Sequence, residues 1–566
     1  MSSLSHYHSI IKDAFQDAFN LHPFEWQLQV IEHLLRMWNN KCSLVRSTVF
    51  LSQPTGGGKA LCRDAYSAIV GGITWSFSPL LPLQTDQVSK LNNYDKAPLV
   101  PINLDEYKSS SERMTKIASE LSSVTFKTPS SYILFCSPQL ITTSKIVMEM
   151  FREHLRKEIL NLVVVDEAHL FVQFGLYFRN EFLDLKDTLF KKLICNEVGT
   201  LVPVLFMTAT ATRRTIDHLS LMTDLTFTAP NCFWPSAEGM LTKKVLVNFQ
   251  YTSRSFCVFK SSVKRLYKDP DTSNKWILFS NTRVIIEKFY HSIRAFLDAE
   301  SYGGDIIQIT GKMYREQKLF HTDLFLNMDS VIQLDIAPTD GIQFDISGFD
   351  ARGCLATRSL GSAGWDNKKV RLVFSADFPD NVLAFVQERG RAGKWQGASP
   401  LTDEYIVCGS VWSYILIVSR LYRNDDGSKT STNESVSSGL QSTQLLPLKD
   451  YQRQSIEDLN VLIIGLILPQ ECINCYVARL TANPYTAIHN HTVDLPPCNN
   501  ACDYCLKVNK SSGASLGFPL LNKAGVQFSF ADMYHGSENK IMDMEMTVEL
   551  LQKIRRYPDA NMSFFK

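Results

Sequence analysis

Several features are scarce in this sequence, and each absence narrows the class of protein. The net charge is +1, so a polyanion would need a local basic groove, because the chain offers no overall positive field. The longest apolar run, residues 461–468, is too short to span a bilayer. The opening residues, MSSLSHYHSIIKDAF, lack the basic and apolar regions of a secretory signal. We therefore expect a globular protein without a membrane partner.

Length and composition set the expected organisation. At 566 residues the chain is too long for one ordinary core, and we expect about three domains. Hydrophobic residues make up 45% and charged residues 20%, which are the proportions of globular proteins. No internal repeat is evident. Residues 424–444 are polar and rich in Ser and Thr, which predicts a flexible linker or a long loop.

The cysteines are unevenly distributed. Five of the 13 fall between Cys472 and Cys505 and the others are scattered, which indicates an intracellular protein with one local cysteine site. Cys498, Cys502 and Cys505 have a spacing that lets thiolates converge on tetrahedral zinc, with one upstream cysteine as the fourth ligand. Buried structural thiols beside a chance cluster are the alternative. The pattern does not separate nucleus from cytoplasm; of the two, we expect the nucleus.

The most distinctive local motif is LSQPTGGGKA at residues 51–60. An apolar run that predicts a buried strand precedes it, and a helical pattern follows Lys59. Glycine lets backbone N–H groups close on phosphate oxygens, the helix start favours negative charge, and the lysine adds a point charge. A flexible surface turn is the alternative. Ala60 replaces the expected Ser or Thr. The residues expected at the nucleotide are Thr55, Gly56, Gly57, Gly58, Lys59 and Ala60.

Further apolar runs alternate with helical patterns, and most of them end in polar residues. We expect strands over residues 73–80, 132–136, 162–165 and 202–206, with a helical stretch between the first two. This alternation predicts an α/β fold with a parallel sheet, and a site at the carboxyl ends of its strands.

Two carboxylates follow the run at 162–165. Asp166 at the end of a buried strand can hold Mg²⁺ through water, and Glu167 can orient or deprotonate an attacking water. A solvated turn is the alternative. Upstream, Gln27 could recognise an adenine edge through its paired donor and acceptor, although such a glutamine is more often simply exposed.

A second α/β unit is expected from about residue 270. Its strands are predicted over residues 275–280, 305–309, 354–357 and 370–374. The segment QERGRAGK, residues 387–394, places basic residues among glycines beside a helical run, which suits a phosphate sensor. An exposed basic loop is the alternative.

In this order, the motifs resemble those of a superfamily 2 helicase, and in particular the RecQ family. QPTGGGKA resembles motif I, FSPLLPL motif Ia, VVVDEAH the DEAH box and FMTATAT motif III. FSNTR resembles motif IV, LATRSLGSAGWD motif V and QERGRAGK motif VI. The segment LFVQFGLYFR is similar to the aromatic loop that couples DNA binding to ATP hydrolysis in that family, and the cysteine cluster to its zinc subdomain. The resemblance covers about residues 20 to 505.

The resemblance implies two tandem RecA-like parallel-sheet domains and a small C-terminal zinc-binding helical subdomain. The expected domains are an ATP-binding RecA-like domain at 1–235, a second RecA-like domain at 236–422, a polar linker or loop at 423–450, the zinc subdomain at 451–510, and a tail of unknown fold at 511–566.

The resemblance also implies roles for single residues. The glycines and Lys59 would cradle the β- and γ-phosphates, Asp166 would hold Mg²⁺, and Glu167 would activate water. The implied catalytic residues are Lys59, Asp166, Glu167, Gln387, Arg391 and Lys394, the last two facing the γ-phosphate. Nucleotide binding adds Gln27, Gly364 and Asp366; coupling to nucleic acid adds His169, Phe174, Phe178 and Arg179. For the two phenylalanines, packing in the core of their own domain is the alternative to stacking on bases.

The implied zinc ligands are Cys475, Cys498, Cys502 and Cys505. Cys475 is preferred to Cys472 because the leucine of CYVARL falls where the family has one after its first ligand.

The function implied is an ATP-dependent 3′ to 5′ DNA helicase that requires ATP, Mg²⁺ and Zn²⁺. Its partner would be single-stranded DNA or a forked duplex; protein partners are not predicted. Ala60, Lys394 in place of an arginine, and a tail after Cys505 without a clear winged-helix pattern depart from the family. Of these departures, Ala60 and Lys394 favour the alternative, a weakened pseudo-helicase that acts as a nucleotide-dependent clamp or scaffold. The aromatic loop and the cysteines disfavour an RNA helicase.

Overall fold

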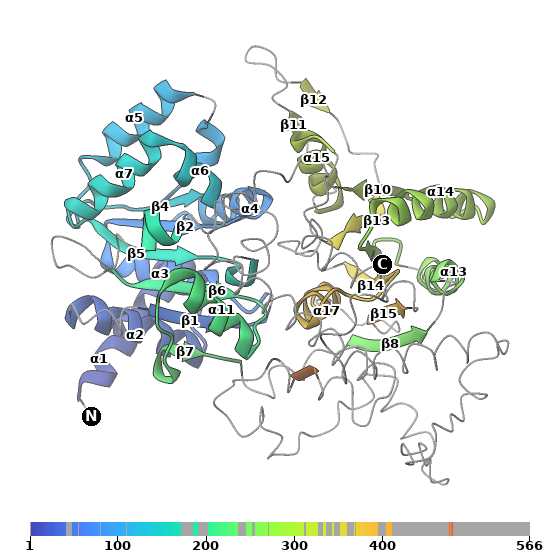
Figure 1. Cartoon of the computed structure of the whole chain (residues 1–566), viewed down its shortest axis with the longest axis horizontal. Helices are drawn as coiled ribbons and strands as arrows, with labels where there is room; N and C mark the ends of the chain where they lie inside the picture. Colours follow the sequence, from blue (N-terminus) through green and yellow to red (C-terminus); the bar gives the residue numbers. More distant parts are fainter. Residues whose placement is uncertain are drawn as a thin grey trace, which may run out of the picture. The chain divides into compact units, whose positions relative to one another are not determined.

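The structure is a computed structural model that divides into two compact units. The first sheet is built from residues before 237 and the second from residues after it, and helices flank each sheet (Figure 1). The structure describes residues 2–40, 48–54, 56–79, 81–108, 110–170, 185–190, 202–235, 245–251, 255–269, 271–310, 313–326, 332–334, 342–344, 351–358, 367, 369–393, 403–409, 475, 477–478 and 481.

The sheet of the first unit has seven strands in the order β3-β4-β2-β5-β6-β1-β7, and all its pairs are parallel. The strands β1, β2, β5 and β6 are buried along their whole length. Burial on both faces fits the largely apolar sequences of β1, β5 and β6, whereas β2 alternates apolar residues with the buried Thr74 and Ser76. The strands are β1 (Thr48–Ser52), β2 (Ile73–Phe77), β3 (Leu99–Asn103), β4 (Ser131–Cys136), β5 (Leu160–Val165), β6 (Val204–Thr208) and β7 (Cys232–Phe233).

One face of this sheet is covered by the N-terminal helices and the helix after the phosphate loop. Phe15, Leu34 and Tyr66 from these helices pack with Val49 and Val164 of the strands in one buried cluster. The helices of the unit are α1 (Ser2–Ala14), η1 (Phe15–Phe19), α2 (Glu25–Asn40), α3 (Ala60–Val70), α4 (Leu81–Asn92), η3 (Leu104–Tyr107), α5 (Ser111–Leu121), α6 (Pro138–Thr143), α7 (Lys145–Arg156), η4 (Lys186–Phe190), α11 (Arg213–Thr223) and η5 (Ala229–Asn231).

The helical stretch expected between residues 80 and 132 is found only in part. The structure has α4 and α5 there, but β3 lies between them. The strand escaped prediction because Pro101 interrupts its short apolar run, and proline is rare inside a sheet. At the edge of the sheet, where β3 lies, a residue without an N–H donor is tolerated.

The second unit contains six parallel strands in the order β10-β13-β9-β14-β15-β8. Its core surrounds Trp276, whose indole lies so close to Gly353 that a Cβ there would be 2.0 Å from the ring. The strands are β8 (Val245–Tyr251), β9 (Lys275–Ser280), β10 (Asp305–Ile309), β13 (Ala351–Thr357), β14 (Val370–Ser375) and β15 (Asp403–Gly409). The helices are α13 (Ser255–Tyr267), α14 (Arg283–Ala299), α15 (Arg315–Leu326) and α17 (Val382–Arg389), and an antiparallel hairpin joins β11 (Ile332–Leu334) to β12 (Ile342–Phe344).

The two parallel α/β units fit the predicted pair of RecA-like domains. The predicted zinc subdomain falls almost wholly outside the described residues and stays a prediction. Within the part of the chain that the structure describes, none of the helices combines the length and apolarity needed to cross a bilayer.

Candidate nucleotide-binding site

The phosphate loop leaves the carboxyl end of β1 and leads directly into α3. Gly56 and Gly58 have φ angles of +78° and +84°, which residues with a Cβ adopt only at a cost, so glycine is required at both positions. The backbone N–H of Gly57 donates to the Pro54 carbonyl at 3.0 Å and closes the turn. At its described residues, the loop is therefore shaped by two glycines at positive φ and by this turn.

Lys59 lies at the end of this loop, immediately before α3. Its ammonium donates to the carbonyl oxygens of Gln53 at 2.8 Å and Pro54 at 3.2 Å. The cation thus lies over the loop that the glycines shape. A phosphate entering the loop could replace these neutral acceptors with charged oxygens, which form stronger hydrogen bonds with an ammonium.

Gln27 joins the start of α2 to the phosphate loop. It is 1% exposed, its Oε1 accepts from the Phe24 N–H at 2.8 Å, and its Nε2 donates to the Gly58 carbonyl at 2.9 Å. It is therefore not an ordinary exposed glutamine. Each of these amide atoms can form a second hydrogen bond, so Gln27 has the donor and the acceptor that the predicted contact with an adenine edge requires.

The acidic pair follows β5 in the same sheet. The N–H of Asp166 donates to the Phe77 carbonyl at 2.8 Å, which continues the pairing with β2 for one residue. The carboxylate of Asp166 is buried, and it accepts from the Gln87 amide at 2.6 Å and from the Glu167 N–H at 2.9 Å. Because parallel strands share their carboxyl edge, β1 and β5 present the phosphate loop and this carboxylate at the same edge.

Opposing electrostatic effects act on Asp166. Burial and the adjacent charge of Glu167 raise the pKa of Asp166. The hydrogen bond from Gln87 and the positive charges of Arg63 and Lys59 lower that pKa. On balance the pKa of Asp166 lies above its usual value, because burial outweighs the nearby positive charges.

Glu167 and His169 connect the acidic pair to motif III. His169 Nδ1 lies 3.4 Å from the Glu167 carboxylate and 2.7 Å from the hydroxyl of Thr208, the last residue of β6. The Thr208 hydroxyl in turn donates to the Thr210 carbonyl at 2.8 Å. His169 is fully buried, so a role in coupling would act through these contacts and not through direct contact with nucleic acid.

The chemistry of the pair fits a hard divalent cation. Glu167 Oε2, which lies 3.4 Å from His169 Nδ1, is buried and accepts no hydrogen bond from the described residues. Such an oxygen carries a desolvation cost that a cation or its bound water would offset. Carboxylate oxygens are the ligands that Mg²⁺ prefers, and Ala60, at the start of α3, contributes no oxygen from its side chain.

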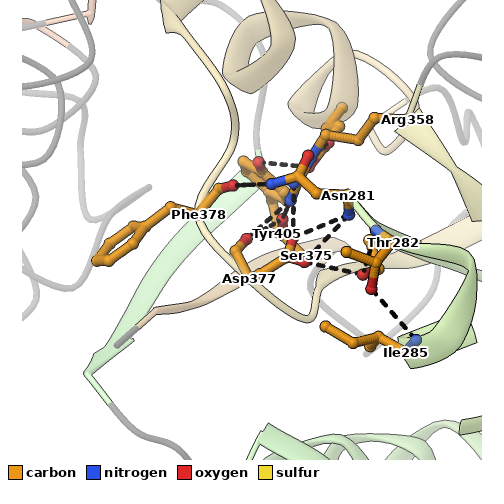
Figure 2. A network of polar contacts seen from close by, with 10 residues as sticks. Asn281, Thr282, Ile285, Arg358, Ser375, Asp377, Phe378 and Tyr405 are labelled. Carbon is orange, nitrogen blue, oxygen red and sulfur yellow. Dashed lines mark hydrogen bonds and ion pairs between the residues drawn. The ribbon is translucent and has the colours of Figure 1, made fainter. Parts of the chain in front are cut away.

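In the second unit, a buried network lies at the carboxyl edge of the sheet (Figure 2). Arg358, just after β13, donates to the Asp377 carboxylate at 2.6 Å and the Phe378 carbonyl at 2.8 Å, and also contacts Glu388 and Ser375. One arginine therefore joins the end of β13 to the end of β14 and to α17.

Two further strands enter the same network. Asp377 accepts from the Ser280 hydroxyl at 2.8 Å and the Asn281 N–H at 3.0 Å, which adds the end of β9. The Tyr405 hydroxyl of β15 donates to Glu388 at 2.9 Å. Burial raises the pKa of Glu388, and the guanidinium beside it opposes that rise.

This network lies next to the predicted motif VI residues. Gln387 is adjacent to Glu388 on α17, and the N–H of Arg391 donates to the Glu388 carbonyl at 3.0 Å. Gln387 and Arg391 are both 4% exposed, so the segment is not a solvated basic loop at these positions.

Several predicted site residues lie outside the described residues and remain predictions. They are Thr55, Gly364, Asp366 and Lys394 of the nucleotide site, Phe174, Phe178 and Arg179 of the coupling loop, and Cys498, Cys502 and Cys505 of the zinc site. Cys475 is described and is 2% exposed.

The polar partners of the predicted residues were not found from the sequence. Arg63, Gln87 and Arg358 are all buried, and each contacts a carboxylate. For Arg63 there was a signal: the adjacent Arg63 and Asp64 lie within the otherwise apolar and small residues of the α3 pattern. A charged pair in such a pattern indicates either a buried ion pair or a site.

Comparison with known proteins shows that the chain is similar to helicases. Residues 24–219 match the DEAD/DEAH box helicase family. The chain is 27% identical over 383 residues to the RecQ-like DNA helicase BLM of Xenopus laevis. This alignment covers 67% of this chain and 24% of that protein. It is 24% identical over 348 residues to the ATP-dependent helicase wrn-1 of Caenorhabditis elegans. This alignment covers 61% of this chain and 28% of that protein.

A solved structure supports the fold. The DUF1998 helicase MrfA bound to DNA and AMPPNP superposes with a TM-score of 0.51 at 15% identity, covering 79% of this chain and 56% of that one. At this identity the likeness concerns the fold alone. The chain spans about a quarter of the length of the two curated relatives, at 24% and 28%.

Proposed function

We propose that this chain, a RecQ-like relative with a DEAD/DEAH box helicase domain, is an ATP-dependent DNA helicase or translocase that moves 3′ to 5′ on single-stranded DNA. The observation that supports this most directly is the convergence of two motifs at one edge of a parallel sheet. The phosphate loop leaves β1, and the buried Asp166 and the partly buried Glu167 follow β5.

In the proposed reaction, the phosphate loop binds ATP and Glu167 activates water. Lys59 exchanges the carbonyls of Gln53 and Pro54 for oxygens of the β- and γ-phosphates, while the backbone of Gly56 and Gly58 surrounds the phosphates. Gln27 contacts both the adenine and the phosphate loop, because its amide already donates to the Gly58 carbonyl.

Asp166 is the residue that would hold Mg²⁺, through water. When bound, Mg²⁺ would neutralise charge that develops on the phosphate oxygens. Glu167 orients the attacking water and takes its proton at the carboxylate oxygen that the described residues leave without a hydrogen bond.

The second unit supplies the sensor for the γ-phosphate in this proposal. Arg358 and Glu388 fix α17, which carries Gln387 and leads into Arg391. In the proposed cycle, each round of ATP binding and hydrolysis moves the chain along DNA.

The second candidate function is a nucleotide-dependent clamp that binds DNA but turns over slowly. Two residues favour it: Ala60 cannot ligate Mg²⁺, and Lys394 lacks the planar fork of an arginine. The acidic pair argues against it, because a clamp has no need of a residue that activates water.

Strand displacement on partial duplexes tests the proposal. A duplex with a 3′ single-stranded tail should be unwound in the presence of ATP, and a duplex with a 5′ tail should not. Equal unwinding of both would contradict the direction of movement. ATP-dependent binding to both without displacement would favour the clamp.

A further inference from the structure

A buried chain of polar side chains leads from α3 to Asp166. Arg63 of α3 donates to Gln87 Oε1 at 2.7 Å, and Gln87 Nε2 of α4 donates to Asp166 Oδ2 at 2.6 Å. Arg63, Gln87 and Asp166 are 1%, 8% and 5% exposed. The carboxylate that would hold the cation is therefore linked through one glutamine to a cation on the helix after the phosphate loop.

The chemistry of the neighbours permits a single orientation of the Gln87 amide. The Arg63 guanidinium has donors only, so it must face the amide oxygen. An ionised Asp166 has acceptors only, so it must face the amide NH₂ group. Turning the amide over would break both hydrogen bonds and place like groups together.

Arg63 is itself held in place by several contacts. It pairs with the Asp64 carboxylate at 2.7 Å, donates to the Ser76 hydroxyl at 3.2 Å and stacks 4.9 Å from the centre of the Phe135 ring. A buried ion pair is weak evidence for stability, because apolar residues of similar volume are often as stable. What this arrangement does provide is a fixed donor for the Gln87 amide.

We infer that Arg63 and Gln87 are positioning residues that hold the Asp166 carboxylate in the orientation needed to bind Mg²⁺ with the nucleotide. This inference rests on the proposed function. Gln87 fixes Oδ2 and the Glu167 N–H fixes Oδ1, so the carboxylate plane is set from both sides. Each oxygen retains a lone pair that can accept from a water on the cation. With Ala60 contributing no ligand, Mg²⁺ affinity depends more strongly on this orientation.

The test measures Mg²⁺ dependence of nucleotide binding, which does not require turnover. A fluorescent non-hydrolysable ATP analogue is titrated into the full chain at increasing Mg²⁺ and again in EDTA. Loss of a hydrogen-bond partner of a metal ligand typically costs about 10–100-fold in metal affinity. Because Asp166 would hold the cation through a water, Gln87→Met should raise the Mg²⁺ concentration for half-maximal binding by the lower end of that range, about 10-fold, and leave the affinity in EDTA unchanged.

Two further variants separate positioning from folding. Gln84→Met is the matched control, because Gln84 is buried on the same helix and donates to the Ser78 carbonyl at 2.8 Å; it should keep the wild-type Mg²⁺ requirement. Arg63→Lys keeps a charge against Asp64 but lacks the fork that also reaches Gln87. It should show a smaller shift than Gln87→Met, and it decides the question if Gln87→Met does not fold.

The outcomes separate this inference from the proposed function. A wild-type Mg²⁺ requirement in both Gln87→Met and Arg63→Lys overturns the inference and leaves the function standing. An equal shift in Gln84→Met also overturns it, because the effect would then be a general loss of packing in α4. A wild-type chain that binds no nucleotide overturns the proposed function, and the inference with it.

Discussion

Ala60 and Lys394 set the expected rate of the proposed ATPase. A lysine near the γ-phosphate keeps a positive charge, but its ammonium is strongly hydrated and cannot form two parallel hydrogen bonds with the transition state. A water can take the position at Mg²⁺ that a hydroxyl after Lys59 would occupy, so Ala60 should matter less. We therefore expect adequate ATP binding and slow turnover.

Reversing both departures should raise the rate. An arginine finger is worth about 10³–10⁵ in kcat, and Lys394 should already supply part of that through its charge. Lys394→Arg with Ala60→Ser should raise DNA-stimulated kcat by roughly 10-fold or more, with a smaller change in KM. An unchanged or lower kcat in the double variant would contradict this account of the two residues.

For single residues, the sequence predicts the site residues that follow a strand and misses the residues that form hydrogen bonds with them. Lys59 is recognisable because it directly follows a glycine series, and Asp166 and Glu167 because the pair directly follows an apolar run. Gln87 lies 79 positions from Asp166, and only the fold brings the two together. No local pattern could have paired them.

At the scale of elements, the polar network of the second unit holds the ends of β9, β13 and β14 together with β15 and α17. Removing the arginine would leave Asp377 and Glu388 buried without their cation, which typically costs about 3–5 kcal/mol. Arg358→Met should therefore be strongly destabilised.

Tyr405→Phe provides the milder variant. It removes only the hydroxyl that donates to Glu388, and we expect a loss of about 1–2 kcal/mol in the free energy of unfolding. Tyr314→Phe, at a tyrosine that is 77% exposed, should change nothing. Urea unfolding measures all three variants, and equal stability of Tyr405→Phe and the wild type would show that this hydroxyl does not support α17.

The start of β15 gives the second unit a dependence on pH. Burial raises the pKa of Asp403 from 3.8 to about 6, although Arg371 beside it acts against the rise. A carboxyl with a raised folded-state pKa binds its proton more tightly in the folded state. Its contribution to stability is therefore full below about pH 4 and is lost as the pH rises to about 6.

Asp403→Asn removes this titration. Over the same pH window, the wild type should lose stability relative to the variant, as measured by thermal unfolding at several pH values. A difference in Tm between the two proteins that stays constant from pH 4 to pH 7 would contradict the assignment to Asp403.

Most inner strands were predicted because strands buried on both faces are continuous apolar runs. β9 and β10 have the predicted bounds, and β6 begins and ends two residues later than expected. In the two parallel sheets, the strands that escaped prediction are β3 with its proline, the two-residue β7, and β8 and β15. Their pairing depends on partners far along the chain and not on local pattern.

At the scale of the whole molecule, the order of the motifs predicted more than any single motif. The resemblance to RecQ-like helicases is confirmed, as is the pair of parallel α/β units. The domain bounds, the direction of movement, the roles of single residues and the zinc site stay predictions.

The zinc site can be tested directly on the full chain. If Cys475, Cys498, Cys502 and Cys505 are the ligands, metal analysis should find one zinc per chain, and Cys502→Ser should lose it. Because the ligation would be structural, chelation should destabilise the C-terminal part before it affects nucleotide binding. Stoichiometric zinc that persists in Cys502→Ser would exclude this ligand set.

The central claim is that the chain hydrolyses ATP in response to DNA, and steady-state ATPase activity with and without single-stranded DNA tests it most directly. We predict hydrolysis that DNA stimulates, reduced about 10²–10⁴-fold in Glu167→Gln with ATP binding retained, and unchanged in the exposed control Glu112→Gln. A wild-type chain that binds ATP and DNA without hydrolysis, or a Glu167→Gln variant that hydrolyses ATP at the wild-type rate, would contradict it.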